Sequence, residues 1–393
     1  MKRWALVALS LAGCGLFGTG RSGGVAGPKT LDMSRWSITK MDVDLVGSPA
    51  ALCPGESVQL SIVAELRHRE RDKVRTAQTY EGNRPGLAGR GKLGFDAFEI
   101  RSGQGRVAEH GWYQPSPDPF VSVDGFTLEV MPTGDAKLLQ ALNYKPRYDC
   151  VTRAGGAGVS GTPGSTGAAG GSGDRGSYGG SSKDGGAGGQ GAPGAAGGQG
   201  TPGGGGASIV AWATVVRTPH HPHLVLLEFE GDVVGRVMFD SHRSFVLSAA
   251  GGPGGRGGPG GSGGSGGDGG HGQQGGTGGS GGSGGSGGTG GQGGPGGRIE
   301  LHIDARFPEL AQLIQLDVAG GSGGFGGMAG SGGRGGRGGN SSAEGASAGA
   351  DGSEGADGAD GANGPVGAAG VATVVHDEVT GRFAALPDGV VRL

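Results

Sequence analysis

Apolar and polar residues alternate along short stretches between residues 36 and 153, which is the pattern of half-buried β-strands. The clearest stretch runs from Val58 to Ala64, directly after the turn signal Pro54-Gly55. Further strands are expected at 37–46, 95–101, 107–113 and 125–131, and one or two helical turns at 136–142. Short strands separated by turns rich in glycine and proline predict an antiparallel β-sandwich.

After residue 153 the pattern changes to short apolar segments that alternate with four glycine-rich tracts. The apolar segments have a strand-like composition. They occupy 208–217, 224–249, 299–318 and 371–393. Gly-X-Y triplets fill the tracts at 155–206 and 349–370, whereas Gly-Gly-X triplets fill those at 251–297 and 320–339, with exceptions at Gln273 and Ala329.

A period of three residues fits neither an α-helix nor a β-strand. It fits a left-handed helix with three residues per turn, as in polyproline II and collagen. Bare glycine edges would let such helices approach closely and exchange backbone hydrogen bonds, which is the polyglycine II arrangement. Three structures remain open: such a bundle within one chain, a collagen triple helix, and a flexible linker. Proline, with 20 of 393 residues, is scarcer than the roughly 15–20% expected of collagen.

Composition and charge exclude several classes of function. Glycine accounts for 101 of 393 residues and aromatic residues for 5%, so much of the chain has no side chains for a hydrophobic core. The formal net charge of −3 predicts no general affinity for nucleic acid. The sequence has no HExxH, P-loop lysine or CxxC motif, and the glycine tracts lack the flanking strand and helix of a dinucleotide fingerprint. We expect neither an enzyme nor a cofactor.

The N-terminus has the pattern of a signal peptide. Lys2 and Arg3 precede a short apolar run at 4–11, which is far shorter than the roughly 20 residues that span a bilayer. The sequence Leu11-Ala12-Gly13-Cys14 follows, and it resembles the bacterial lipobox. The resemblance implies that residues 1–13 are removed and that Cys14 receives a lipid.

The whole chain resembles bacterial glycine-rich, collagen-like lipoproteins, on the strength of the lipobox and the triplet tracts. This resemblance implies a palmitate-bearing protein attached to a lipid bilayer through Cys14. In known lipoproteins, aspartate after the lipidated cysteine favours retention in the inner membrane. Gly15 stands here, which implies the outer membrane of a Gram-negative bacterium.

The sequence therefore predicts an all-β protein with a sandwich-like N-terminal domain and glycine-rich tracts, bundled or disordered, between short strands. The expected parts are a signal peptide (1–13), a lipidated tether (14–35), the β domain (36–153), a Gly-X-Y tract (154–206), a β segment (207–250), a Gly-Gly-X tract (251–298), a β segment (299–319), a second Gly-Gly-X tract (320–340), an acidic Gly-X-Y tract (341–370) and a C-terminal β segment (371–393).

Lipidation of Cys14 leaves Cys53 and Cys150, an even pair in an exported chain, which predicts a disulfide. The two cysteines lie near the ends of the β domain, so their bridge would close it. A disulfide across a loop this long adds up to roughly 4–5 kcal/mol to the stability of a domain.

Two groups of side chains are weak candidates for metal ligands. His220, His221 and His223 lie together, but the flanking prolines favour a hairpin loop. The carboxylates at spacing three favour a solvated edge over a calcium site, and they could instead face Arg334 and Arg337 as paired ridges. These carboxylates are Asp351, Glu354, Asp357 and Asp360.

Two functions remain in view. A structural or surface role in the cell envelope follows from the large fraction of residues without side chains. A surface binding module is the alternative, in which the β domain recognises a glycan or an envelope protein. The basic stretch at 67–75 and the pair Trp112-Tyr113 motivate this alternative, although a solvated, partly self-paired loop is favoured for the basic stretch. Oligomers are expected if the tracts form a collagen-like trimer.

Overall fold

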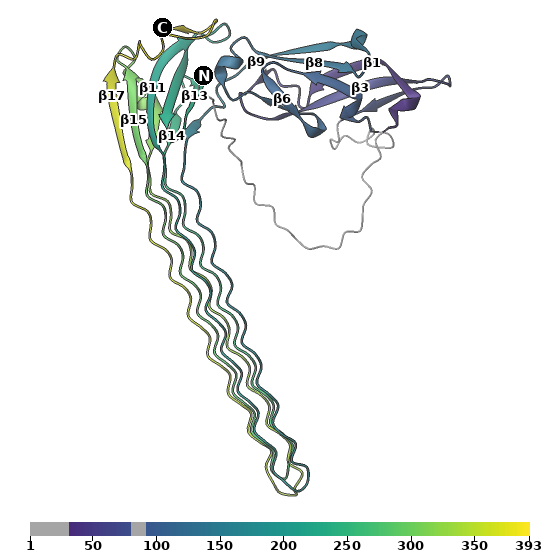
Figure 1. Ribbon diagram of the computed structural model, residues 1–393, viewed down its shortest axis with the longest axis vertical. Helices are drawn as coiled ribbons and strands as arrows, with labels where there is room; N and C mark the ends of the chain where they lie inside the picture. The colour runs from purple at the N-terminus through teal and green to yellow at the C-terminus, as the bar shows by residue number, and fades with distance from the viewer. Residues whose placement is uncertain (1–30, 80–91) are drawn as a thin grey trace, which may run out of the picture.

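The computed structural model describes residues 31–79 and 92–393. Nearly all regular structure in these residues is β-strand, and the one α-helix among them, α1 (Leu310–Leu313), is a single turn. Figure 1 shows three parts: an N-terminal β domain, a β head beside it, and a long rod that extends from the head. The prediction of an all-β protein is confirmed.

Two sheets form the N-terminal domain and share one core. The first holds β1 (Trp36–Leu45), β3 (Val58–His68), β4 (Val74–Gln78), β6 (Gly105–Ala108) and β7 (Trp112–Pro115). The second holds β2 (Ala51–Leu52), β5 (Phe98–Arg101), β8 (Phe126–Pro132) and β9 (Gln140–Pro146). Alternate residues of both sheets, such as Ile62 and Leu128, are fully buried between them. This arrangement is the predicted sandwich.

The structure corrects the predicted strand at 107–113. A 3-10 turn at Glu109–Gly111 divides this segment into β6 and β7, because His110 and Gly111 both have positive φ angles. The reversal pairs the two strands with each other in antiparallel fashion. The helical turn predicted at 136–142 is a 3-10 turn at Ala136–Leu138, and the rest of that segment enters β9.

Two further sheets form the head. One consists of β11 (Ser208–Arg217), β12 (Leu224–Gly231), β13 (Gly235–Asp240), β15 (Arg298–Asp304), β17 (Val371–Asp377) and β18 (Val391–Arg392). The other is parallel and consists of β10 (Arg153–Gly155), β14 (Phe245–Ser248) and β16 (Ile314–Asp317). Ile299 and Leu301 of the larger sheet pack with Phe245 and Leu247 of the smaller one in a common core.

Six glycine-rich segments form the rod, and we number them helices I to VI. They are I (156–179), II (185–206), III (251–270), IV (275–297), V (320–339) and VI (349–370). Every third residue of each helix donates its backbone N–H to the same neighbour, which requires three residues per turn. A rise of about 3.1 Å per residue makes the rod roughly 60–75 Å long.

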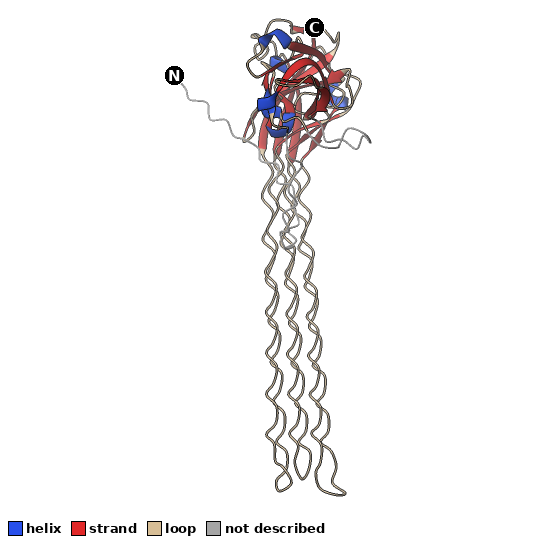
Figure 2. Ribbon diagram, turned by 90° about the vertical axis from the view of Figure 1, so that its right-hand side faces the viewer, coloured by secondary structure: helices blue, strands red, loops and turns tan. Residues whose placement is uncertain are grey.

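The helices form two layers of three, as the paired chains in Figure 2 show. Helices I, III and V run outward and continue β10, β14 and β16. Helices II, IV and VI return and lead into the parallel strands β11, β15 and β17. Each layer of the rod is therefore the continuation of one sheet of the head.

The number of glycines per triplet follows the number of neighbouring helices. Helices III and IV each bond to four neighbours, and a Cβ on either glycine of their triplets would overlap a neighbouring carbonyl. Gly254, for example, lies against Gly291, and Gly255 lies against Thr162. Helices I and VI lie at the edges with two neighbours each, so one glycine per triplet is enough. The single-chain bundle is thus confirmed among the three structures left open by the sequence.

The N-terminal domain packs directly against the head. Val123 and Tyr148 join a cluster of buried side chains with Leu226 and Met238 of the head. The guanidinium group of Arg236 in the head lies 3.6 Å from the carboxylate of Asp118 and over the ring of Phe120, 4.4 Å from its centroid. These contacts fix the position of the domain beside the base of the rod.

Asp304, at the end of β15, is a buried carboxylate that braces the larger sheet of the head. It accepts hydrogen bonds from the hydroxyl of Thr214 on β11 (2.7 Å) and from the guanidinium of Arg306 (2.7 and 3.0 Å). Burial raises the pKa of this carboxyl, but the hydrogen bonds and charge of Arg306 and the bond from Thr214 outweigh it and lower the pKa to about 2.

We expect the protein to lose about 2 kcal/mol of stability as the pH falls from about 4 to 2. The folded-state pKa lies below the ordinary value of 3.8, so the contribution is complete above that value and disappears as Asp304 is protonated. Urea midpoints measured across this range test the prediction, with Asp304→Asn as the comparison. The variant should be less stable at neutral pH and should show a flatter acid limb. An unchanged acid limb in Asp304→Asn would contradict the assignment.

Candidate functional site

The predicted lipidation site, Cys14, lies outside the described residues. Among residues 31–79 and 92–393, no helix is long and apolar enough to cross a membrane. The attachment to a bilayer therefore remains a prediction from the sequence.

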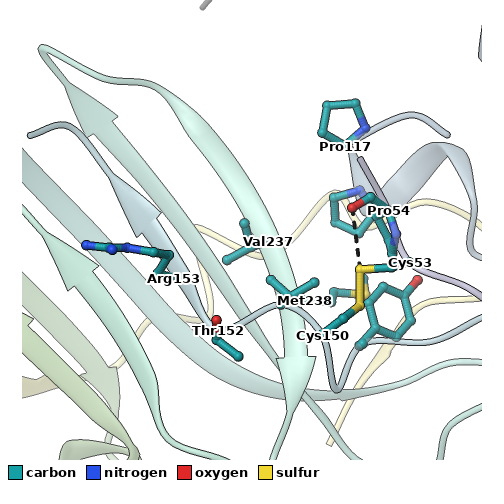
Figure 3. A pocket seen from close by; sticks show the side chains of 11 residues that line it. Cys53, Pro54, Pro117, Cys150, Thr152, Arg153, Val237 and Met238 are labelled. Carbon is teal, nitrogen blue, oxygen red and sulfur yellow. Dashed lines mark hydrogen bonds between the residues drawn. A yellow bond between two sulfur atoms is a disulfide. The ribbon is translucent and has the colours of Figure 1, made fainter. Parts of the chain in front are cut away.

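Cys53 and Cys150 form the predicted disulfide, with Cα atoms 6.3 Å apart. Glu56 lies close to both sulfurs, but sulfurs bonded to each other do not serve as thiolate ligands for a metal. A small pocket opens beside the bridge at the junction with the head (Figure 3). Pro117 lines it from the N-terminal domain, and Val237 and Met238 line it from β13. Tyr148, Thr152 and Arg153 supply the polar groups of its wall.

The three histidines do not converge on a common point. They lie in the loop that joins β11 to β12, as the hairpin interpretation predicts. The Nε2 atom of His220 lies 3.1 Å from the carbonyl oxygen of Asp124, while the ring of His221 packs edge-on against Tyr148. Burial lowers the pKa of His221 and raises that of Tyr148 to about 12. These side chains serve the domain junction and form no metal site in the described structure.

The basic stretch at 67–75 is the hairpin between β3 and β4. It is partly self-paired: Arg67 lies 3.7 Å from Asp72, and Arg69 donates a hydrogen bond to the carbonyl of Trp36. Of the pair Trp112-Tyr113, one side chain is exposed and the other is buried. Strand alternation leaves Trp112 42% exposed but buries Tyr113 completely. This part of the N-terminal domain offers one aromatic ring rather than a platform.

The acidic edge, defined as Asp351, Glu354, Asp357 and Asp360, has a different role from those considered from the sequence. Its aspartates accept hydrogen bonds from backbone N–H groups of helix V, with distances of 2.7 to 2.8 Å. The donors are Ala329, Gly332 and Gly338. The corresponding N–H groups of helix III donate to carbonyls of helix V. Helix V is the last helix of its layer, so its own groups have no further helix of that layer to bond. The aspartates thus replace the carbonyls of a missing seventh helix.

The predicted pairing of the acidic edge with Arg334 and Arg337 is wrong. No ion pair joins them in the part of the chain that the structure describes, because the two arginines point away from helix VI on the outer face of helix V. The break in the glycine frame at Ala329 has no structural explanation, because a Cβ at the equivalent positions Gly326 and Gly332 would overlap carbonyl oxygens of helix VI.

We expect Asp360→Ala to destabilise the rod by about 1 kcal/mol, since a backbone donor loses its acceptor. Glu354→Ala is the matched control. It removes the same charge from the same edge, yet Glu354 accepts no hydrogen bond in the described structure. Thermal melting of both variants, followed by circular dichroism, measures the difference. Equal losses in the two variants would show that the edge acts through its charge alone.

The distal end of the rod is held rigidly by bonds between its three turns. The turn at 180–184 accepts hydrogen bonds from the backbone of Gln273 to Lys183 (2.7 Å) and from the Ser342 hydroxyl to Gly180 (3.1 Å). The Ser341 hydroxyl donates to the carbonyl of Gln273 (2.7 Å). Side chains that project from this end therefore have fixed anchor points.

The outer face of the rod, on helices I, III and V, gathers side chains from three separate tracts into rows. Interhelix hydrogen bonds place the residues of each row at one level. The three most distal rows are Ser172–Ser265–Arg334, Arg175–Asp268–Arg337 and Tyr178–His271–Asn340. Arg175, Tyr178 and His271 give no joint signal in the sequence, because these residues come together only through the order of the helices.

No family model matches the chain, and no curated protein matches it. One similar solved structure is the antifreeze protein of the springtail Granisotoma rainieri, a bundle of nine polyproline type II helices. It is 28% identical, and the aligned region covers 51% of this chain and 94% of that one, with a TM-score of 0.09. A TM-score this low does not establish a shared fold.

Proposed function

We propose that this protein is an envelope lipoprotein with a structural or surface role, in which a lipid on Cys14 anchors a rigid projecting rod. The lipobox-like sequence before Cys14 supports the anchor. The disulfide between Cys53 and Cys150 supports an oxidising compartment. The rod supports the projecting role.

The network of backbone hydrogen bonds within helices I to VI carries this proposal. It is continuous from the head to the distal turns and needs no second chain. Small, exposed side chains cover most of the rod, which has few groups for chemistry but a defined length and stiffness. A self-supporting rod of this kind suits a spacer or a display element.

Cell fractionation and labelling test the proposal. Cys14→Ser should abolish palmitate incorporation and move the protein out of the membrane fraction. Ser182→Cys, in a distal turn, should react with a membrane-impermeant maleimide in intact cells. Ser248→Cys is a matched control, because Ser248 is buried in the head and should react only after denaturation. Labelling of Ser182→Cys only after lysis would exclude exposure at the cell surface, and palmitate incorporation into Cys14→Ser would exclude the anchor.

A binding module remains the second candidate function. In the N-terminal domain it is supported by the exposed Trp112, and on the rod by the charged and aromatic rows at the distal end. Loss of binding on removal of one of these two surfaces would distinguish them.

A further inference from the structure

Three arginines lie together near the distal end of the outer face. Arg175 and Arg337 occupy one row, on either side of Asp268, and Arg334 lies one turn nearer the head. Arg334 and Arg337 are three residues apart on one helix, so their anchor points are about 9 Å apart. The arginines therefore present positive charges at intervals along and across the face.

These guanidinium groups have no carboxylate partner among the described residues. Asp268 is the one acidic residue in the distal rows, and its Oδ1 atom accepts the backbone N–H of Arg337 at 2.9 Å. The nearby turns add one basic side chain, Lys183, and two acidic ones, Asp184 and Glu344. The excess of positive charge is thus confined to the outer face itself.

An exposed aromatic side chain completes the surface. Tyr178 is 79% exposed and packs edge-to-face with His271, with ring centroids 6.4 Å apart. His271 holds the ring at the end of the arginine rows and leaves a ring face open to solvent. An aromatic ring with a polar hydroxyl is suited to stacking on the C–H face of a sugar while its hydroxyl forms hydrogen bonds.

We propose that this distal outer face binds an anionic polysaccharide, with Arg175, Arg334 and Arg337 pairing with its acid groups and Tyr178 stacking on a sugar ring. Guanidinium groups match carboxylates through paired hydrogen bonds. Arginines anchored about 9 Å apart along one helix suit a chain that repeats its charge. The fixed backbone of the rod reduces the ordering cost of binding.

The biological setting of this inference rests on the proposed surface role, because the face meets an external polysaccharide only if the rod is exposed. Its test does not depend on that role. The full chain, purified in detergent, is titrated with polygalacturonate as the probe and with neutral dextran as the control polymer. We expect binding to polygalacturonate that weakens with added salt, and none to dextran.

Arg175→Gln/Arg334→Gln/Arg337→Gln should weaken binding of polygalacturonate about tenfold, and Tyr178→Ala should weaken it severalfold. The matched control, Arg67→Gln/Arg71→Gln/Lys73→Gln, removes the same charge from the hairpin of the N-terminal domain and should bind normally. Equal loss in the control, binding to dextran, or no binding by the unmodified protein would overturn the proposal. Equal or tighter binding to phosphatidylglycerol vesicles would assign the face to a lipid surface and would also overturn it.

Discussion

Gly264→Ala is expected to lower the free energy of unfolding of the rod by about 3 kcal/mol, at the upper end of ordinary overpacking. Gly264 lies in the middle of helix III, and a Cβ there would overlap the carbonyl oxygen of Gly171 on helix I. The backbone at both Gly264 and Gly171 is fixed by hydrogen bonds to helix II. The N–H of Gly264 donates to the carbonyl of Ala192, and the N–H of Ala192 donates to the carbonyl of Gly171. The melting temperature should fall by roughly 6–12 °C.

Gly171→Ala provides a control at almost the same point in space. Gly171 faces solvent on helix I, and nothing lies within 4 Å of the position that its Cβ would take. Replacing it should leave stability unchanged or raise it by about 0.4–1 kcal/mol, because alanine restricts the unfolded chain. Circular dichroism of the two variants during heating provides the comparison. Equal effects of the two substitutions would mean that the helices are not packed at backbone contact.

Cys53→Ala/Cys150→Ala is expected to destabilise the N-terminal domain by about 4–5 kcal/mol. The bridge spans a sequence separation of 97 residues, so its removal greatly enlarges the set of unfolded conformations. The double substitution is preferable to a single one because it leaves no free thiol. Guanidinium denaturation followed by near-ultraviolet circular dichroism reports on the buried Tyr113 and Trp36 of this domain.

The far-ultraviolet circular dichroism of the glycine helices, recorded during the same denaturation, is an internal control. No residue of helices I to VI contributes to the disulfide, so the rod should keep its midpoint in the double variant. An unchanged midpoint for the N-terminal domain would contradict the prediction. A parallel loss in both signals would show instead that the domain and the rod unfold as one unit.

Much of the architecture was readable from the sequence. Alternation in β3 and in β8 predicted their buried faces, and the period of three predicted helices with glycine edges. The even pair Cys53 and Cys150 predicted the bridge. These features depend on local periodicity or on simple counting, which a single sequence shows directly.

Features that depend on the order of the helices were not readable in this way. The aspartates of the acidic edge have the spacing of a charged ridge in any three-residue helix, and only their place beside the last outward helix makes them acceptors for its backbone. Tyr178 and His271 are 93 residues apart, and they meet because helices I and III lie side by side. The division of β6 from β7 depended on a positive φ angle at His110, a residue type that gives only a weak turn signal.

The identical triplets of helices III and IV have a consequence for how the rod can change over generations. Sliding one helix past its neighbour by three residues restores the same backbone bonds, so the triplets alone do not determine the register between the two helices. The strands of the head fix one end of each helix, so a difference in length between neighbouring helices changes the distal turns. Slippage during DNA replication that adds or removes nine bases therefore lengthens or shortens a helix without breaking its pattern. Matched changes in all six helices change the length of the rod in steps of about 9 Å. The length of the rod is therefore inherited as a whole number of triplets.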